Sequence, residues 1–195
     1  MVDASYRRRK LVEDLSLHIL DIIENSIAAG ATNIEVEIDE KVMENLLIIK
    51  IKDNGKGMDR RTLHKALDPF YTTKKTRSVG LGLSMLAQAS KEADGSFDIK
   101  SKPGEGTDIT ARFVYNHIDR KPLGNMAETI AACLVSLQSG MDLRYRHRKD
   151  NSEFLFDTKK IKKVLSGVSI NNAEIISFLK KHIEVGLNEI AKKEK

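Results

Sequence analysis

Apolar residues recur along the chain with two periods, one typical of helices and one typical of strands. Between Leu11 and Ala29 they return every three or four positions, which is the spacing of one helix face. Ile34, Val36 and Ile38 alternate with polar residues, which is the spacing of a strand with one buried face. Helices are predicted in this way at residues 11–29, 60–67, 83–93, 123–137, 158–165 and 172–192. Strands are predicted at residues 34–38, 46–52, 97–101, 108–115, 141–148 and 153–157. Turn residues predict a hairpin from the third and fourth strands and another from the last two.

The hydrophobic pattern changes near residue 120, where helical spacing follows the alternating positions of the first hairpin. We therefore expect one domain at residues 1–120 and a C-terminal helix–hairpin–helix extension at residues 121–195. The charge changes at the same place. The first part is neutral, whereas the second holds 14 Lys and Arg against 9 Asp and Glu, which accounts for the whole net charge of +5.

The basic excess of the extension could favour an acidic protein surface or nucleic acid, but most often such an excess marks a solvated helix surface. Nucleic acid is not expected as a partner, because no run of aromatic residues lies among the basic ones to stack on bases. Arg144, Arg146 and Arg148 alternate on one face of a predicted strand. They could face a partner or simply keep an exposed strand soluble.

The composition excludes several classes of protein. With 41% hydrophobic and 31% charged residues, the chain can bury a core, so it is not a wholly disordered protein. No apolar run approaches the roughly 20 residues that span a bilayer, so no membrane association is expected. Cys133 is the single cysteine, which excludes an intramolecular disulfide and favours a reducing compartment. We therefore expect a cytoplasmic protein.

The first predicted helix carries a polar stripe. Asp14, His18, Asp21 and Asn25 follow one another at steps of four, three and four residues, which places them on one face. The simplest interpretation is the wet side of an amphipathic helix. The alternative is a site for a hard cation, because Asn25 could offer Mg²⁺ a carbonyl oxygen and Asp21 could orient or deprotonate a water.

Two glycine motifs follow. The predicted strand 46–52 ends in Asp53-Asn54-Gly55-Lys56-Gly57, where a carboxylate could accept a hydrogen bond from a base amine and the glycines could lie against a planar ligand. A plain tight turn would look similar. Gly80-Leu81-Gly82-Leu83 opens a helix, whose free N–H groups form an anion site. The preceding loop holds Lys74, Lys75 and Arg77, which could close over phosphates.

The order of these motifs resembles the Bergerat ATP-binding fold of the gyrase, heat-shock chaperone, histidine kinase and MutL (GHKL) superfamily. ENSIAAGA (24–31) is similar to its N box, DNGKGM (53–58) to its first glycine box and DPFYTTK (68–74) to its F box. SVGLGLSM (78–85) is similar to its second glycine box and GEGTDITARF (104–113) to its last motif. Together they look most like the histidine-kinase branch. The resemblance implies an α+β fold, a two-layer sandwich with helices on one face of a mixed, mostly antiparallel sheet.

The resemblance also implies that the chain binds ATP and Mg²⁺. Asn25 would coordinate the metal, Asp53 would bind the adenine amino group, and Thr107 would support the adenine. Residues 68–79 would form the ATP lid, with Phe70 packed at its base or lying in the core. The other implied ATP-binding residues are Gly55, Gly57, Lys74, Lys75, Gly80, Leu81, Gly82 and Leu83.

The sequence departs from the family pattern at three places. Many histidine kinases have a Lys or Arg three residues after the N-box Asn, where this chain has Ala28, so Lys74 or Lys75 could take its place. Ser78 stands where a glycine is common, which would stiffen the lid. Hydrolysing members carry a Glu four residues before the Asn, where this chain has the shorter Asp21.

A histidine kinase also needs a dimerisation hairpin that carries the phosphoacceptor histidine. Only about ten residues precede the first predicted helix, and His18 lies inside that helix, so the acceptor is expected on another protein. The predicted function is therefore a Mg-ATP-binding, kinase-like protein that phosphorylates or regulates a partner in trans. Two alternatives stay open: an ATP-hydrolysing conformational switch that uses Asp21, and a binding module regulated by ATP. A homodimer is a further option.

Overall fold

The computed structural model describes residues 14–68 and 81–192, and its elements confirm the predicted order of helices and strands within them. The helices are α1 (Leu15–Ala28), α2 (Arg60–Ala66), α3 (Gly82–Glu92), α4 (Met126–Ser136), α5 (Thr158–Leu165) and α6 (Ala173–Lys192). The strands are β1 (Asn33–Lys41), β2 (Leu46–Asp53), β3 (Ser96–Lys102), β4 (Gly106–Val114), β5 (Asp142–Lys149) and β6 (Ser152–Asp157). None of the described helices is both long and apolar enough to cross a membrane.

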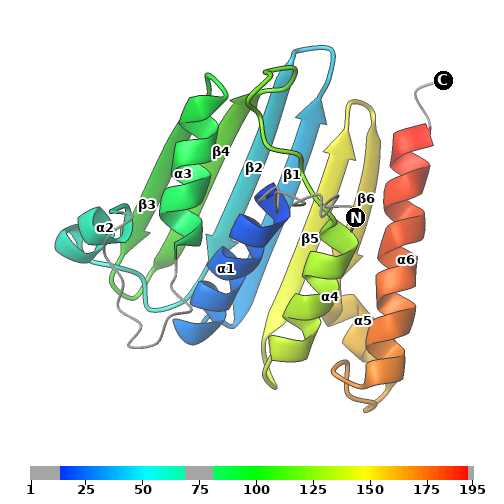
Figure 1. Cartoon of the computed structure of the whole chain (residues 1–195). Helices are drawn as coiled ribbons and strands as arrows, with labels where there is room; N and C mark the ends of the chain where they lie inside the picture. The colour runs from blue at the N-terminus through cyan, green and yellow to red at the C-terminus, as the bar shows by residue number, and fades with distance from the viewer. Residues whose placement is uncertain (1–13, 69–80, 193–195) are drawn as a thin grey trace, which may run out of the picture.

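The six strands form one twisted sheet in the order β3-β4-β2-β1-β5-β6 (Figure 1). Both predicted hairpins are confirmed, since β3 pairs with β4 and β5 pairs with β6 in antiparallel register. β1 and β2 are also antiparallel, whereas β1 and β5 are parallel. The sheet is therefore mixed and mostly antiparallel, as the family resemblance implies.

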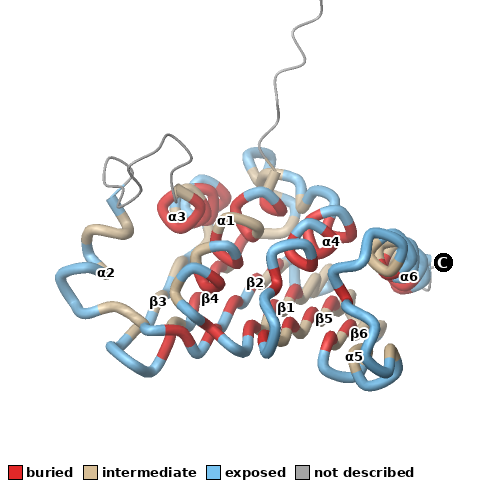
Figure 2. Tube along the Cα trace, turned by 90° about the horizontal axis from the view of Figure 1, so that it is seen from below, coloured by how far each residue is buried: buried red, intermediate tan, exposed pale blue. Residues whose placement is uncertain are grey.

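Helices α1, α3, α4 and α6 lie on one face of the sheet and leave much of the other face open (Figure 2). The alternation of β1 explains this arrangement: Ile34, Val36 and Ile38 are fully buried under the helices, while the residues between them face outward. Asp14 starts α1 by accepting a hydrogen bond from the Leu17 N–H, a typical N-cap contact. The fold is thus the predicted two-layer α+β sandwich.

The arginine stripe of β5 lies on the open face, where acidic residues of β1 stand beside it. The Arg148 guanidinium is 2.9 Å from the carboxylate of Asp39, and that of Arg146 is 3.7 Å from Glu37. Parallel pairing of β1 with β5 places these opposite charges side by side along the strands. The stripe is therefore paired at these two positions within the sheet itself.

The segment after residue 120 continues both layers. β5 pairs with β1 along eight residue pairs, and α4 packs against α1. Tyr145 of β5 and Leu134 of α4 belong to the same hydrophobic core as Ile38 of β1. The division into domains 1–120 and 121–195 stays a prediction, but sheet and core run without interruption across that boundary.

Candidate functional site

The carboxylate of Asp53, at the end of β2, is fixed by two hydrogen bonds. Its side chain is only 8% exposed. The Ser26 hydroxyl of α1 donates to one carboxylate oxygen at 2.9 Å, and the Gly55 N–H donates to the other at 2.8 Å. Each oxygen retains lone-pair capacity for a further donor. Asp53 is therefore an oriented acceptor at the point where β2 gives way to the glycine-rich loop.

Thr107 lies directly opposite Asp53 in the register of β2 and β4. Its hydroxyl is 3.0 Å from the hydroxyl of Ser101 on β3, which also accepts a hydrogen bond from the Met58 N–H. These contacts tie the loop after β2 to the first residues of β4. The structure thus brings Asp53, Gly55, Gly57 and Thr107 together, as the sequence predicts.

Two glycines allow this close approach of backbones. Gly57 has φ +61°, and a Cβ added there would lie 1.9 Å from the carbonyl oxygen of Lys102. Gly106 has φ +86°, and its added Cβ would lie 2.0 Å from the carbonyl oxygen of Asp53. Any larger residue would force the loop and the hairpin apart. The two glycines therefore shape the wall of the site around Asp53.

The start of α3 meets α1 through Asp21. The Gly82 N–H donates to the Asp21 carboxylate at 2.6 Å. A Cβ added at Gly82 would lie 2.6 Å from the same carboxylate oxygen, so a side chain would disturb this junction. Leu81 precedes α3 without a side-chain cap, and Leu83 is buried in the core. The Asp21 carboxylate thus accepts a hydrogen bond from one of the N–H groups that the sequence analysis expects to bind a phosphate.

Asn25 is half-buried and follows Asp21 by one turn of α1, so both lie on the same helix face. Because Asp21 contacts the first residue of α3, this face is the one beside the start of α3, and α1 and α3 run side by side over the sheet (Figure 1). The Asp21–Asn25 part of the polar stripe is therefore turned toward the second glycine motif rather than only toward solvent.

Several predicted site residues lie outside the described residues. They are Phe70, Lys74, Lys75 and Gly80. Their roles stay predictions, as does that of the lid at residues 68–79.

The structure adds two residues that the sequence analysis missed, Ser26 and Ser101. Ser26 follows Ile22 by four positions on the buried face of α1, and Ser101 continues the inward-facing series of Phe97 and Ile99 on β3. A polar residue at a position that faces the core needs a hydrogen-bond partner there. This signal was present in the sequence and could have identified both residues.

The residues at the α1–α3 junction are compatible with a magnesium ion that takes most of its oxygen ligands from phosphates and waters rather than from the protein. Mg²⁺ prefers oxygen ligands and usually takes only one or two from protein, together with waters and phosphates. Asn25 can supply one such oxygen, and the Asp21 carboxylate lies one turn away. No group of three or more His, Cys, Asp or Glu residues that could hold a metal by themselves occurs in the described part of the chain.

The segment of the chain that contains these residues matches a known protein family. Residues 11–117 match the family described as histidine kinase-, DNA gyrase B-, and HSP90-like ATPase. The matched segment contains α1, the Asp53 loop, the start of α3 and Thr107.

Individual relatives are named as kinases. Sporulation kinase C of Bacillus subtilis (strain 168) is 35% identical over 88 residues, which cover 45% of this chain and 20% of that protein. Sensor protein kinase FleS of Pseudomonas aeruginosa is 34% identical over 92 residues, 47% of this chain and 23% of that protein. Sensor histidine kinase YxdK of Bacillus subtilis is 27% identical over 106 residues, 51% of this chain and 32% of that protein. The chain thus spans less than a third of these relatives.

Proposed function

Because the chain belongs to the histidine kinase-, DNA gyrase B- and HSP90-like ATPase family, we propose that it binds Mg·ATP at the Asp53 site and transfers the γ-phosphoryl group to a partner protein. Its ATP-binding domain is of the histidine kinase type. The observation that carries the proposal is the oriented Asp53 carboxylate opposite Thr107, with the α1–α3 junction at the same end of the helices.

At the adenine end, the Asp53 carboxylate would accept a hydrogen bond from the exocyclic amine. Ser26 and Gly55 hold the carboxylate in one orientation, so little freedom is lost when the base binds. Thr107 would contact the base directly or through a water. The glycine-shaped wall at Gly57 would let the base lie against backbone.

At the phosphate end, the start of α3 offers backbone N–H groups and the positive end of a helix dipole. The Asp21 carboxylate already accepts the Gly82 N–H, so it would stand close to the phosphates and repel them. A magnesium ion bound through Asn25 would supply the positive charge that neutralises the phosphate oxygens. In this family branch, positioning and charge neutralisation would provide most of the catalysis.

Transfer to a partner is favoured over hydrolysis by the placement of Asp21. Its carboxylate fixes the start of α3, which leaves it less available to activate a water. The relatives named as sensor kinases support a kinase activity. The acceptor would be a histidine or serine of another protein. A kinase that draws on cellular ATP would act in the cytoplasm.

Calorimetric titration with ATP and Mg²⁺ tests the site. Asp53→Asn should weaken ATP binding at least tenfold, because the amide presents a donor where the base amine needs an acceptor. Asp108→Asn is the matched control, since Asp108 is exposed on β4 beside Thr107. The Asp108 variant should bind ATP as tightly as the wild type. Equal affinity of the Asp53 variant and the wild type would remove the adenine assignment.

Asn25→Ala tests the metal. It should abolish the gain in ATP affinity that Mg²⁺ gives the wild type, and an unchanged metal dependence would exclude Asn25 as a ligand. For the reaction, γ-labelled ATP should transfer its label to a protein captured by the ATP-loaded chain. Steady phosphate release without any partner would instead favour the hydrolytic switch.

A further inference from the structure

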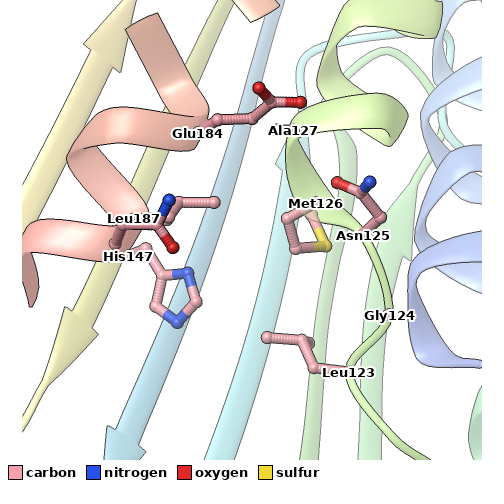
Figure 3. A pocket seen from close by; sticks show the side chains of 9 residues that line it. Leu123, Gly124, Asn125, Met126, Ala127, His147, Glu184 and Leu187 are labelled. Carbon is pink, nitrogen blue, oxygen red and sulfur yellow. The ribbon is translucent and has the colours of Figure 1, made fainter. Parts of the chain in front are cut away.

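A cavity lies outside the ATP-binding segment. Its volume is about 380 Å³, within the usual range of small-molecule sites, and it opens between the start of α4, β5 and α6 (Figure 3). The described residues that line it are Leu123, Gly124, Asn125, Met126, Ala127, His147, Glu184, Leu187 and Asn188. All of them lie beyond residue 117, where the family match ends.

One wall of the cavity is held against α1 by backbone contacts. The Leu15 N–H donates to the carbonyl of Pro122 at 3.0 Å. Gly124 has φ +85°, and a Cβ added there would lie 2.3 Å from the carboxyl carbon of Asp14. Asn125 then caps α4 by accepting a hydrogen bond from the Glu128 N–H. The wall is therefore built into the fold rather than formed by a loose loop.

The floor is His147, which is 95% buried, with 5% of its surface exposed. One ring nitrogen lies 2.8 Å from the Tyr145 hydroxyl and the other 2.7 Å from a carboxylate oxygen of Glu40. The other oxygen of Glu40 accepts a hydrogen bond from the Tyr115 hydroxyl. Because both nitrogens are engaged inside the protein, the ring offers the cavity a fixed carbon edge and no hydrogen bond.

The charge of the cavity comes from Glu184. Apart from the His147 imidazole, Glu184 is the one acidic or basic side chain among the described residues of the lining. Lys180 lies one turn earlier on α6, but its ammonium group is hydrogen-bonded to Glu128 of α4. These two charges offset each other, and the α4 dipole adds only about half a positive charge. The end of the cavity that holds Glu184 therefore has a net negative charge.

Behind the floor, Glu40 is matched by positive groups. The positive charge of Lys149 attracts the Glu40 carboxylate, and the charges of Lys149 and Arg120 act on the Tyr115 hydroxyl that donates to it. His147 contacts Glu40 directly. The 2.7 Å contact places the Glu40 carboxylate directly against the His147 ring, on the side away from the cavity. The carboxylate that faces the cavity is therefore that of Glu184. Lys180 attracts it from one turn away on α6, but Lys180 also donates to Glu128, so one ammonium group is shared between two carboxylates.

The rest of the lining is largely apolar. Figure 3 shows Glu184 at one end of the cavity and Leu123 at the other, with Met126 and His147 facing each other between them. A ligand that fills this space needs a positive head for the carboxylate and a short apolar stem for the leucine, methionine and imidazole surfaces. A neutral or anionic ligand would displace water from the Glu184 carboxylate and leave it only its share of the Lys180 charge.

We infer that this cavity binds an organic cation, an ammonium group on a short alkyl stem, with Glu184 as its counter-ion. The same chemistry is presented by a free alkylamine and by the lysine side chain of a peptide. This site would be separate from the ATP site, and the inference does not depend on the proposed function.

An NMR titration of the full chain tests the inference with pentylammonium, its neutral analogue 1-pentanol, and N-acetyl-lysine amide. Pentylammonium should produce saturable shifts of the amides of Leu123, Met126 and Leu187, and pentanol should bind at least tenfold more weakly. Glu184→Gln should weaken pentylammonium binding at least tenfold. Glu189→Gln, an exposed position on the same helix, should leave it unchanged.

Comparing pentylammonium with N-acetyl-lysine amide distinguishes a free amine from a protein lysine as the natural ligand. Tighter binding of the capped lysine would point to a protein side chain, and tighter binding of pentylammonium to a free amine; either supports the site. Equal binding of pentylammonium and pentanol, or equal weakening by the Glu184 and Glu189 variants, would overturn the assignment of Glu184. No saturable shift at the three amides with either cation would overturn the site itself.

Discussion

The hydroxyl of Ser26 is the side-chain group that joins α1 to the Asp53 carboxylate. Ser26→Ala would leave one carboxylate oxygen in a buried place without that donor. We expect the free energy of unfolding to fall by about 1–3 kcal/mol and ATP affinity to fall severalfold. Denaturant unfolding and calorimetry measure the two effects. Ser90→Ala is the control, because Ser90 is equally buried but bonds only within α3.

If Ser90→Ala reduced ATP affinity as much as Ser26→Ala, the effect would be one of burial rather than of orientation, and the assignment of Ser26 would be wrong.

Asp53, Asn25 and Thr107 could be predicted from the sequence because each stands in a recognisable motif. The core-facing position of Ser26 marks it as a polar residue that needs a partner, but the partner could not be predicted, since Asp53 lies 27 positions away. Only the packing of α1 over the end of β2 brings the two together. The same is true of Asp21, whose bond to Gly82 depends on how α1 and α3 meet.

The half-buried carboxylate of Glu40 predicts a pH dependence of stability. Burial by itself would raise its pKa, but hydrogen bonds from His147 and Tyr115, together with the charges of His147 and Lys149, hold the pKa below its ordinary value. A carboxyl with a lowered pKa stabilises the fold above its unfolded pKa, near 4.5, and loses this effect as the pH falls through the folded pKa.

Glu40→Gln should therefore lower the free energy of unfolding at neutral pH by about 1–3 kcal/mol. The difference from the wild type should shrink as the pH falls below about 4.5. Urea unfolding between pH 3 and 7 measures this (roughly the range over which carboxyls titrate). Glu92→Gln, at an exposed position on α3, should run parallel to the wild type, and a Glu40 variant that did so too would contradict the prediction.

At the scale of elements, α6 comes very close to β6 at Gly186. A Cβ added there would lie 2.1 Å from the ring of Phe154, which α6 covers. Gly186→Ala should therefore destabilise the protein by about 1–3 kcal/mol through overpacking. Thermal or denaturant unfolding measures the change.

A double-mutant cycle provides the control. In a Phe154→Ala background, the ring is gone and the same Gly186→Ala change should become neutral or stabilise by up to about 1 kcal/mol, because Ala favours a helix over Gly. The same loss in both backgrounds would show that contact with Phe154 is not the reason for the glycine.

The helices and strands themselves could be predicted from hydrophobic periodicity, because each period reports which face of an element is buried. The pairing of β5 with β1 could not be predicted in this way. A strand's own pattern fixes its buried face but not its neighbour, and β5 lies about a hundred positions after β1 in the sequence. The arginine stripe illustrates the consequence: only the pairing shows that Glu37 and Asp39 are its neighbours.

At the scale of the whole molecule, this pairing makes a prediction about the boundary near residue 120. A chain cut there would lose β5 from the edge of β1 and α4 from the side of α1. Ile38 and Ile23 would lose core neighbours such as Tyr145 and Leu134, and an unpaired apolar strand edge is prone to aggregation. We expect the fragment 1–120 to unfold at lower temperature, with a broad transition, and to self-associate.

Circular dichroism melting and analytical ultracentrifugation of the fragment and the full chain measure this. The ATP titration of the fragment then separates folding from binding, because Asp53, Thr107 and Asn25 all remain in it. A fragment that melted as sharply and as high as the full chain, as a monomer with unchanged ATP affinity, would establish residues 1–120 as an independent domain. A weakened fragment would instead mean that residues 121–195 belong to the fold that supports the nucleotide site, as the pairing of β5 with β1 leads us to expect.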